Sequence, residues 1–261
     1  MKEFLGFGGY TREPEGAYSW QHLLFVGTLL TVMTLLAIWL GRKNRNKTLA
    51  QKNKVIIASA ILIDAFEIFK ITILCLRADG GPSLRPILTT LPLFLCSIQL
   101  IAIPLAAFTK GRIEEAALDF VSIFGLLGAV CGTIGAAQNY GCYPVLSMDN
   151  VVSGITHCIS GFAALYIMIS GMERMRKKNM VITYGILLFF CIAAYVANIL
   201  IDYNYMFLMR GDGTPYDILY NLVSGNPVLY PALVVGLFLI YIYAFYSIFH
   251  LFAKKKEKAA V

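Results

Sequence analysis

One cysteine and two histidines are the residues of this chain that could carry out covalent chemistry. Cys96 lies between Pro92 and Pro104 in an apolar stretch, and a proline frees a backbone carbonyl and often kinks a helix, which makes room for a site. The thiolate is the nucleophilic form of cysteine, and a neighbouring imidazole favours it. With His157 or His22 beside it, Cys96 could therefore hold an acyl group as a thioester. Without such a neighbour, a buried cysteine is an inert apolar side chain.

Three ionisable residues form a second candidate site. Asp64, Glu67 and Lys70 follow one another at i, i+3 and i+6, a spacing that brings neighbours together on one face of a helix. Each charge costs about 2.5–3.5 kcal/mol at the centre of a bilayer on insertion scales. Two interpretations stay open. One is a structural Glu67–Lys70 ion pair, with Asp64 protonated or paired to another helix, and the other is the polar wall of a cavity.

A third polar group follows the apolar stretch that ends near residue 201. Asn198 and Asp202 are spaced i, i+4 on one face, and Asn204 follows two residues later. We treat these three residues as candidate substrate-binding residues. The loop 202–227 that they open is rich in tyrosine, and its segment 216–223 places apolar residues on one side, which predicts a short interfacial helix.

Membrane-spanning helices must position these residues. Seven stretches carry almost no charge, and each is near the length of about 20 residues that crosses a bilayer. Runs of this length are helical, because unpaired backbone groups are too costly in lipid. The predicted fold is all-α, a single seven-helix membrane bundle that covers residues 1–261. Its spans lie at about 21–41, 55–76, 86–109, 116–137, 152–172, 180–201 and 228–252.

The distribution of positive charge orients the predicted bundle. Sixteen of the 22 Lys and Arg residues lie in the first, third and fifth gaps between spans or in the C-terminal tail. The positive-inside rule then places the N-terminus outside and the C-terminus inside, as a multi-pass protein of the cell membrane. His22, His157, Asn198 and Asp202 all come at the outer ends of their spans. We therefore expect them to converge in the outer half of the bundle.

Composition and motifs exclude several classes of protein. Hydrophobic residues make up 58% of the chain and the mean hydropathy is +0.70, whereas soluble domains average about 45–50% apolar residues. The net charge of +7 does not indicate nucleic-acid binding, because the basic residues lie in short loops beside apolar runs, where they set topology. We find no Walker loop, dinucleotide fingerprint or zinc-type Cys/His spacing, so we expect neither a cofactor nor a metal.

The remaining expectations concern partners and covalent links. Membrane lipids are the expected partners, and the oligomeric state stays open. Cys75 and Cys142 both fall near the predicted outer surface, where a disulfide between them is possible. The glycine-rich stretch 125–135 favours close packing of helices. The first 19 residues carry charges and have no apolar core, so we expect no cleavable signal peptide.

Two stretches of the chain resemble a known membrane protein family. The stretch 91–96, LPLFLC, and the stretch 198–208, NILIDYNYMFL, together resemble the YwaF-type integral membrane proteins of bacteria, and His22 and His157 fit that family's pattern. The resemblance covers essentially the whole chain. The chain departs from it at Phe94, where bacterial members commonly have His. The family is related to a eukaryotic transmembrane protein regarded as a cysteine-dependent acyltransferase of ether phospholipids, and this relation implies a Cys–His acyl-transfer site.

The first functional hypothesis is an enzyme that acts on lipid acyl groups, as an acyltransferase or an acyl hydrolase. Cys96 would be the nucleophile and His157 the general base, and His22 or Asn198 would orient the base or donate to the oxyanion.

The rival hypothesis is a non-enzymatic carrier or ligand-binding protein. It would use Asp64, Glu67 and Lys70 as the site for a small molecule or an ion. If Asp64 and Glu67 lined the same cavity as His157, this hypothesis would gain weight. A third interpretation is an accessory subunit without chemistry of its own.

The orientation is testable by cysteine-accessibility labelling in intact cells. A membrane-impermeant maleimide should label a cysteine placed at Asp149 and should not label one placed at Lys177, because the two positions lie on opposite sides of the predicted membrane. Labelling at Lys177 from outside would overturn the predicted orientation.

Overall fold

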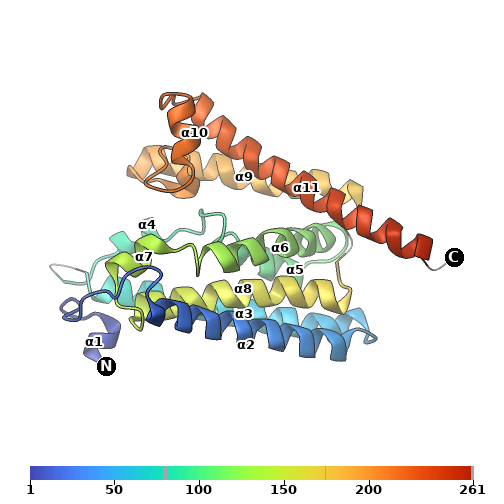
Figure 1. The fold of residues 1–261 in the computed structure, drawn as a ribbon, viewed down its shortest axis with the longest axis horizontal. Coiled ribbons are helices and arrows are strands. Elements are labelled where there is room, and N and C mark those ends of the chain that lie inside the picture. The colour runs from blue at the N-terminus through green and yellow to red at the C-terminus, as the bar shows by residue number, and fades with distance from the viewer. Residues whose placement is uncertain (79–80, 174, 260–261) are drawn as a thin grey trace.

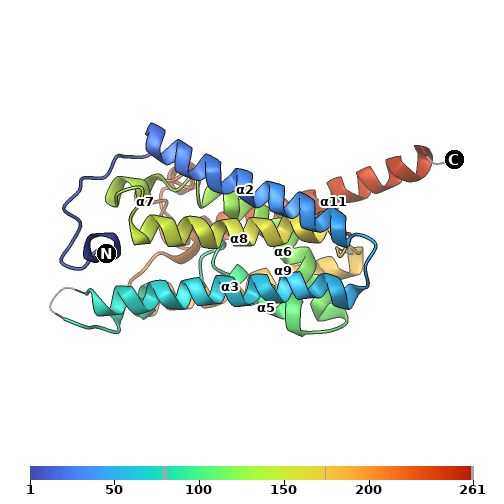
Figure 2. The ribbon, with the colours of Figure 1, turned by 90° about the horizontal axis from the view of Figure 1, so that it is seen from below.

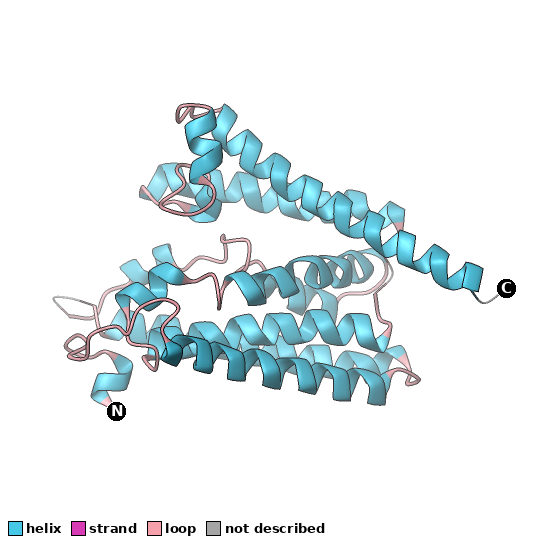
Figure 3. Ribbon diagram, in the orientation of Figure 1, coloured by secondary structure: helices cyan, strands magenta, loops and turns pink. Residues whose placement is uncertain are grey.

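Helices dominate the chain, and the part of it that the structure describes contains no strand (Figure 3). This computed structural model describes residues 1–78, 81–173 and 175–259. Arg174, one of the predicted inner charges, lies outside the described residues. The helices are α1 (Lys2–Leu5), α2 (Trp20–Asn44), α3 (Leu49–Leu76), α4 (Arg85–Thr89), α5 (Gln99–Phe108), α6 (Arg112–Cys131), α7 (Ala137–Cys142), α8 (Met148–Ser170), α9 (Lys177–Ile201), η1 (Tyr205–Phe207), α10 (Asp217–Leu222) and α11 (Leu229–Ala259).

Hydroxyl side chains start three of the long helices. Ser19 caps α2, Thr48 caps α3 and Ser147 caps α8, and each accepts a hydrogen bond from a backbone N–H in the first turn. At α3, Gln51 returns a bond to the backbone of Thr48 and completes a capping box. Such caps satisfy donors that the first turn leaves without a helical partner.

Four helices are long and apolar enough to cross a membrane: α2, α8, α9 and α11 up to Leu251, with mean hydropathies of 1.6 to 2.4. Only 17–28% of the most apolar window of α2, α9 and α11 is buried inside the protein, so these helices present apolar side chains outward. Trp20 and Trp39, both exposed, lie about 28 Å apart along α2. That separation is close to the thickness of the hydrocarbon core of a bilayer, about 30 Å. Tryptophan is enriched at both membrane–water interfaces, so the two side chains are spaced to lie one at each interface.

The long helices form two groups (Figures 1 and 2). In one group α2 and α3 flank α8, and α6 and α5 pack against this layer. In the other group α9 pairs with α11, and α9 packs on α6. From Ala116 to Gly125 every residue of α6 is buried, as expected for a central helix that neighbours surround.

One predicted span is broken. The sequence predicts a continuous helix over 86–109, but α4 ends at Thr89 and α5 begins only at Gln99. We call the irregular segment between them, residues 90–98, the strap. Pro92 accounts for the break, because proline has no N–H to donate and its ring clashes with the preceding turn. Pro104, in contrast, lies inside α5 without ending it.

The other predicted helices are present with shifted ends. The helix predicted over 116–137 runs from Arg112 to Cys131, and the rest of that range forms a turn and the start of α7. The short helix predicted over 216–223 is confirmed as α10, whose Ile218 and Leu222 are exposed. The count of seven spans and their orientation stay predictions.

Polar contacts tie the N-terminal segment to α3 and α8. Arg77, at the end of α3, donates to Asp149 at 2.5 Å and to the phenol of Tyr10 at 3.0 Å. Tyr10 donates in turn to Asp149 at 2.6 Å. Burial, reinforced by the carboxylate of Asp149, raises the pKa of Tyr10 to about 12, so the phenol keeps the proton that it donates.

A buried carboxylate joins the two groups of helices at the opposite end. Asp119 of α6 is fully buried. It accepts hydrogen bonds from Tyr246 of α11 at 2.9 Å, from the side chain of Asn179 of α9 at 3.3 Å, and from the backbone N–H of Met175 at 2.9 Å. Tyr246 also lies 3.1 Å from the hydroxyl of Thr183. A buried charge needs such partners, so this network fixes α9 and α11 on α6.

Removing one phenol should test this network. We expect Tyr246→Phe to lower the free energy of unfolding by about 1–3 kcal/mol, because it leaves a charged acceptor short of one donor. The matched control is Tyr243→Phe on the same helix, where the side chain is 61% exposed and the expected change is below about 0.5 kcal/mol. Thermal unfolding of the purified protein in detergent measures both. Equal losses in the two variants would contradict the assigned role.

Candidate functional site

A cavity of about 40 Å³ lies between α3, α8 and the start of α5, with room for a few water molecules or an ester group. Polar and apolar side chains share its wall. The lining residues are Ile63, Glu67 and Lys70 from α3, Cys96 and Ser97 from the strap, Leu100 from α5, and Thr156, His157 and Ser160 from α8. The cavity thus brings together candidates from two of the three groups that the sequence singles out.

Cys96 and His157 meet in this cavity. The thiol of Cys96 and the imidazole of His157 both line the cavity and interact with each other. The hydroxyl of Ser97 and the backbone N–H of Cys96 itself also interact with the sulfur. The sulfur further precedes the N-terminus of α5, where the helix dipole favours negative charge. All these groups stabilise a thiolate, the reactive form of cysteine.

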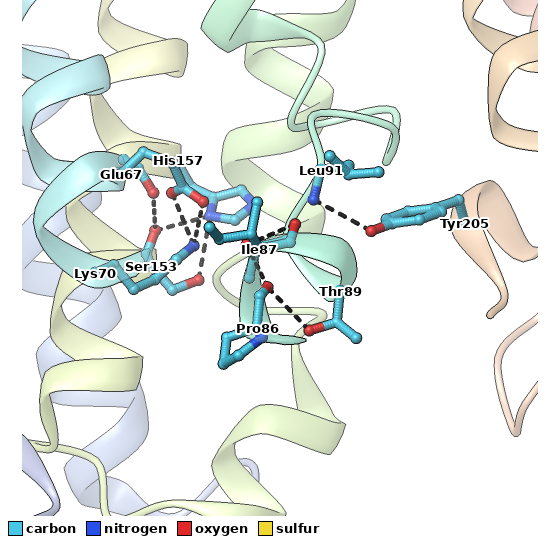
Figure 4. A network of polar contacts seen from close by, with 11 residues as sticks. Glu67, Lys70, Pro86, Ile87, Thr89, Leu91, Ser153, His157 and Tyr205 are labelled. Atoms are coloured by element: carbon cyan, nitrogen blue, oxygen red, sulfur yellow. Dashed lines mark hydrogen bonds and ion pairs between the residues drawn. The ribbon is translucent and has the colours of Figure 1, made fainter. Parts of the chain in front are cut away.

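The hydrogen bond on the far side of the His157 ring sets its tautomer. Nδ1 lies 2.7 Å from the carbonyl oxygen of Ser153, one turn earlier in α8 (Figure 4). A carbonyl only accepts, so we assign the ring proton to Nδ1, which leaves Nε2 with a lone pair in the neutral ring. An imidazole held in this way can take a proton from a thiol and later return it.

Two glycines of α6 make room for the pair. A Cβ atom at Gly132 would overlap the imidazole ring of His157. One turn earlier, a Cβ atom at Gly128 would lie 3.4 Å from the Cβ atom of Cys96, which is an ordinary van der Waals contact. Cys96 and His157 therefore pack on adjacent turns of one glycine face of α6, and only Gly132 is sterically required.

An ion pair forms another part of the wall. The Lys70 ammonium lies 2.7 Å from each carboxylate oxygen of Glu67 (Figure 4). Both side chains are largely buried, with exposures of 20% and 12%. The third member of the predicted group, Asp64, is half-buried and does not line the cavity, although its charge interacts with that of Glu67.

Tyr205 holds the strap in place. Its hydroxyl accepts from the N–H of Leu91 at 3.2 Å (Figure 4). It also donates to the carbonyl of Leu88 at 2.5 Å. The ring of Phe94 packs against the Tyr205 ring with centroids 5.1 Å apart. The two stretches that carry the resemblance, 91–96 and 198–208, are therefore in direct contact, and the second supports the segment that carries Cys96.

Asn198 and Asn204 support this arrangement from outside the cavity. Asn198 accepts from the N–H of Tyr205 at 2.6 Å and donates to its carbonyl at 3.1 Å. Asn204 closes the following loop through bonds to the carbonyl of Arg210 and the carboxylate of Asp212. Asp202 is exposed and ends α9 in a left-handed conformation. None of these three predicted substrate-binding residues lines the cavity.

The structure also places His22 away from Cys96. Its Nδ1 accepts from the N–H of Tyr18 at 2.9 Å, and its Nε2 lies 3.2 Å from the carbonyl of Thr133 at the end of α6. The ring stacks on Tyr140 with centroids 3.8 Å apart. Both ring nitrogens are thus engaged, and His22 ties α2 to α6. The expected convergence of His22, His157, Asn198 and Asp202 on one cavity does not occur, because only His157 lines it.

Several residues of the site carry no signal in the sequence. Ser97, Thr156 and Ser160 are ordinary small polar residues, and only their neighbours show that they line a cavity. Only Ser160 could have been found from its spacing, since it lies at i+3 to His157 on one helix. Among the described residues, no cluster of three or more His, Cys, Asp or Glu could hold a metal ion, and all six cysteines are free, Cys75 and Cys142 included.

Comparison with known proteins gives a family-level result. Residues 17–253 match the TMEM164 family, a range that includes every residue lining the cavity. No curated protein and no solved structure matches the chain.

The glycine face predicts a difference between two equally small substitutions. Gly132→Ala should displace the His157 ring and slow alkylation of Cys96 by iodoacetamide about tenfold or more, because the thiolate loses its imidazole partner. Gly128→Ala should leave the rate nearly unchanged, since its methyl group meets Cys96 at a normal distance. Mass spectrometry of the peptide that contains Cys96 measures both rates. Equal rates in the two variants would show that the His157 position does not control the thiol.

Proposed function

Because the chain belongs to the TMEM164 family, a family of membrane proteins, we propose that it is a membrane enzyme that transfers acyl groups through a thioester on Cys96. The substrates proposed are lipid acyl esters, with a lipid hydroxyl or water as acceptor. The sequence resemblance to YwaF-type proteins, and their relation to a cysteine-dependent acyltransferase of ether phospholipids, point to the same reaction. We place this activity in the cell membrane.

One observation carries the proposal. A thiol and an imidazole from distant parts of the chain, Cys96 and His157, line the same cavity and interact with each other there. A third group, the carbonyl of Ser153, orients the imidazole at 2.7 Å. Nucleophile, base and orienting group in this order are the arrangement of cysteine and serine acyl-transfer enzymes.

The first half of the reaction forms the thioester. Nε2 of His157 takes the proton of the Cys96 thiol, and the sulfur attacks the carbonyl carbon of the donor ester. The carbonyl electrons move to oxygen and give a tetrahedral oxyanion. When they return, the bond to the leaving alkoxide breaks, and His157 gives its proton to that oxygen. The products are an acyl-Cys96 thioester and a free alcohol, and His157 is neutral again.

The second half releases the acyl group. His157 takes the proton of the acceptor hydroxyl, whose oxygen attacks the thioester carbonyl. Collapse of the tetrahedral intermediate expels the sulfur of Cys96, which recovers a proton from His157. A lipid hydroxyl as acceptor gives a new ester, and water gives a free fatty acid, so exclusion of water from the small cavity decides between transferase and hydrolase.

The surroundings of the cavity favour a lipid substrate. Ile63 and Leu100 line it beside the reactive pair, and an ester-sized space suits the reacting group rather than a whole lipid. The acyl chain then lies along the apolar helix surfaces. This arrangement leaves the long apolar part of the substrate in the hydrocarbon of the membrane, away from water.

A second candidate function is a carrier or ligand-binding protein. The observation that favours it is that Glu67 and Lys70 line the same cavity as His157, although Asp64 does not. Such a protein would bind its ligand through the ion pair and would not need the thiol of Cys96. Retention of full function by Cys96→Ala would therefore favour this candidate.

The proposed enzyme is testable with purified protein in nanodiscs. The donor is a phospholipid labelled in its acyl chain, and the acceptor is a lysophospholipid. We expect Cys96→Ala to reduce turnover to background and His157→Gln to reduce it about 10²–10⁴-fold, as for loss of a general base. Intact mass spectrometry should detect a hydroxylamine-sensitive acyl adduct on the parent protein and not on Cys96→Ala.

The matched control is Cys158→Ala. Cys158 is buried next to His157 in sequence but does not line the cavity, so turnover should persist. Turnover in Cys96→Ala equal to that of the parent would rule out covalent catalysis at this residue.

A further inference from the structure

We propose that Lys70, held in place by Glu67, donates a hydrogen bond to the oxyanion that forms when Cys96 attacks an ester. The proposal rests on the acyl-transfer function proposed above and adds a catalytic residue to it. Glu67 acts as the positioning residue, because it contacts Lys70 and not the substrate.

The ion pair leaves one donor of Lys70 available. An ammonium has three N–H donors. The two carboxylate oxygens of Glu67 each lie 2.7 Å from Nζ, and among the described residues Lys70 has no other hydrogen-bond partner. Since Lys70 also lines the cavity, the third donor is available to an acceptor placed there. Two bonds to one carboxylate fix the direction of the ammonium, which is the preorganisation that oxyanion stabilisation needs.

The ammonium and the thiol act on the same small volume. Lys70 and Cys96 both line a cavity of about 40 Å³, and the charge of Lys70 is felt at the imidazole of His157. An ester carbonyl attacked by the sulfur therefore places its oxygen within this volume. Of the side chains that line it, Glu67 and the thiolate are acceptors. The hydroxyl of Thr156 donates to the carbonyl of Ser153 and that of Ser97 interacts with the sulfur, so Lys70 and Ser160 are the donors left available.

Ser160 provides a second, independent sign that an oxygen atom belongs in the cavity. Its side chain is 3% exposed and lines the cavity, and its hydroxyl has no partner among the described residues. A buried hydroxyl without a partner is rare in native proteins. The cavity thus has two donors available to an acceptor, one from Lys70 and one from Ser160. Lys70 is the stronger of the two, because a charged donor makes the stronger bond to an anionic oxygen.

The charge balance favours a transient oxyanion over a permanent anion. Glu67 and Lys70 neutralise each other, and so do a Cys96 thiolate and a His157 imidazolium. Attack on a neutral ester only moves the negative charge from sulfur to oxygen, so the net charge of the cavity stays at zero. A bound phosphate would add an uncompensated charge at membrane depth, which is costly. The cavity also has room for an ester group and not for a phosphodiester beside it.

The test uses the full chain in nanodiscs with p-nitrophenyl decanoate as the probe, which carries no phosphate. The burst of p-nitrophenolate, together with the acyl adduct on Cys96, gives the rate of the acylation step. We expect Lys70→Gln to slow acylation about 100-fold, as for the loss of one oxyanion donor. Lys70→Arg should restore part of the rate, and Glu67→Gln should give an intermediate rate. The matched control is Lys52→Gln, which removes a lysine of the same helix that bonds to the carbonyl of Ser170.

Two further readouts separate an oxyanion donor from a structural lysine. The thionoester analogue of the probe places sulfur where the oxyanion would form, and sulfur accepts hydrogen bonds weakly. The preference of the parent for the ester over the thionoester should therefore collapse in Lys70→Gln and persist in Lys52→Gln. Alkylation of Cys96 by iodoacetamide forms no oxyanion, so Lys70→Gln should leave its rate nearly unchanged.

Each other outcome overturns a stated part of the argument. If the parent forms no adduct on Cys96, the proposed function fails, and the role of Lys70 fails with it. If the parent forms the adduct and Lys70→Gln acylates at the same rate, only the role of Lys70 fails. If alkylation slows as much as acylation, Lys70 acts on the thiolate and the oxyanion assignment is wrong.

Discussion

The position of Cys96 depends on the hydrogen bonds between Tyr205 and the backbone around the strap. A non-helical segment at membrane depth has backbone groups that lipid cannot satisfy. The Tyr205 hydroxyl serves two of them at once, the N–H of Leu91 and the carbonyl of Leu88. The break at Pro92 is tolerated for this reason, and the break is what turns the backbone so that Cys96 can precede the N-terminus of α5. The loop that carries Tyr205 is itself costly to build, since Met206 and Phe207 have positive φ angles of 56° and 55°, which non-glycine residues seldom adopt. Asn198 bonds to both backbone groups of Tyr205 and thereby stabilises this conformation.

The second constraint is the close approach of α6 to its neighbours. Gly132 leaves the space that the His157 ring occupies, and Gly125 faces the backbone carbonyl of Ser160. In lipid, helices associate through van der Waals packing and not through the hydrophobic effect, so small residues are used where backbones must approach. At this interface they also leave room for functional side chains. The glycines of α6 therefore serve both the packing of the bundle and the geometry of the Cys96–His157 pair.

Charged side chains inside the bundle have local polar partners. Glu67 pairs with Lys70 at the cavity, and Asp119 accepts bonds from α9, α11 and the segment before α9. A charged side chain without partners would be costly in either place. The two networks differ in what remains free. The donors around Asp119 converge on a single buried carboxylate, whereas the ammonium of Lys70 has a donor left and a cavity in front of it. That difference separates a structural network from a candidate functional one.

The sequence by itself determined the helical class and the positions of most long helices, and it singled out Cys96 with His157 or His22 as the candidate pair. Apolar runs of membrane length are a local signal, because lipid leaves helix as the main solution for each run separately. Cys96 and His157 were identifiable by type, since few residues can carry an acyl group or move its proton. Pro92 marks where the helix predicted over 86–109 could break, but the path of the broken segment was not identifiable, because it is held by Tyr205, more than a hundred residues further along the chain. Which of the two histidines, His157 or His22, lies beside Cys96 is likewise decided by the tertiary structure. Both residues lie at the predicted outer end of their helices. The His22 ring contacts the carbonyl of Thr133, whereas the His157 ring occupies the space left by Gly132, beside Cys96. Pairing of this kind depends on which helix faces meet, and one span carries no information about the face of another.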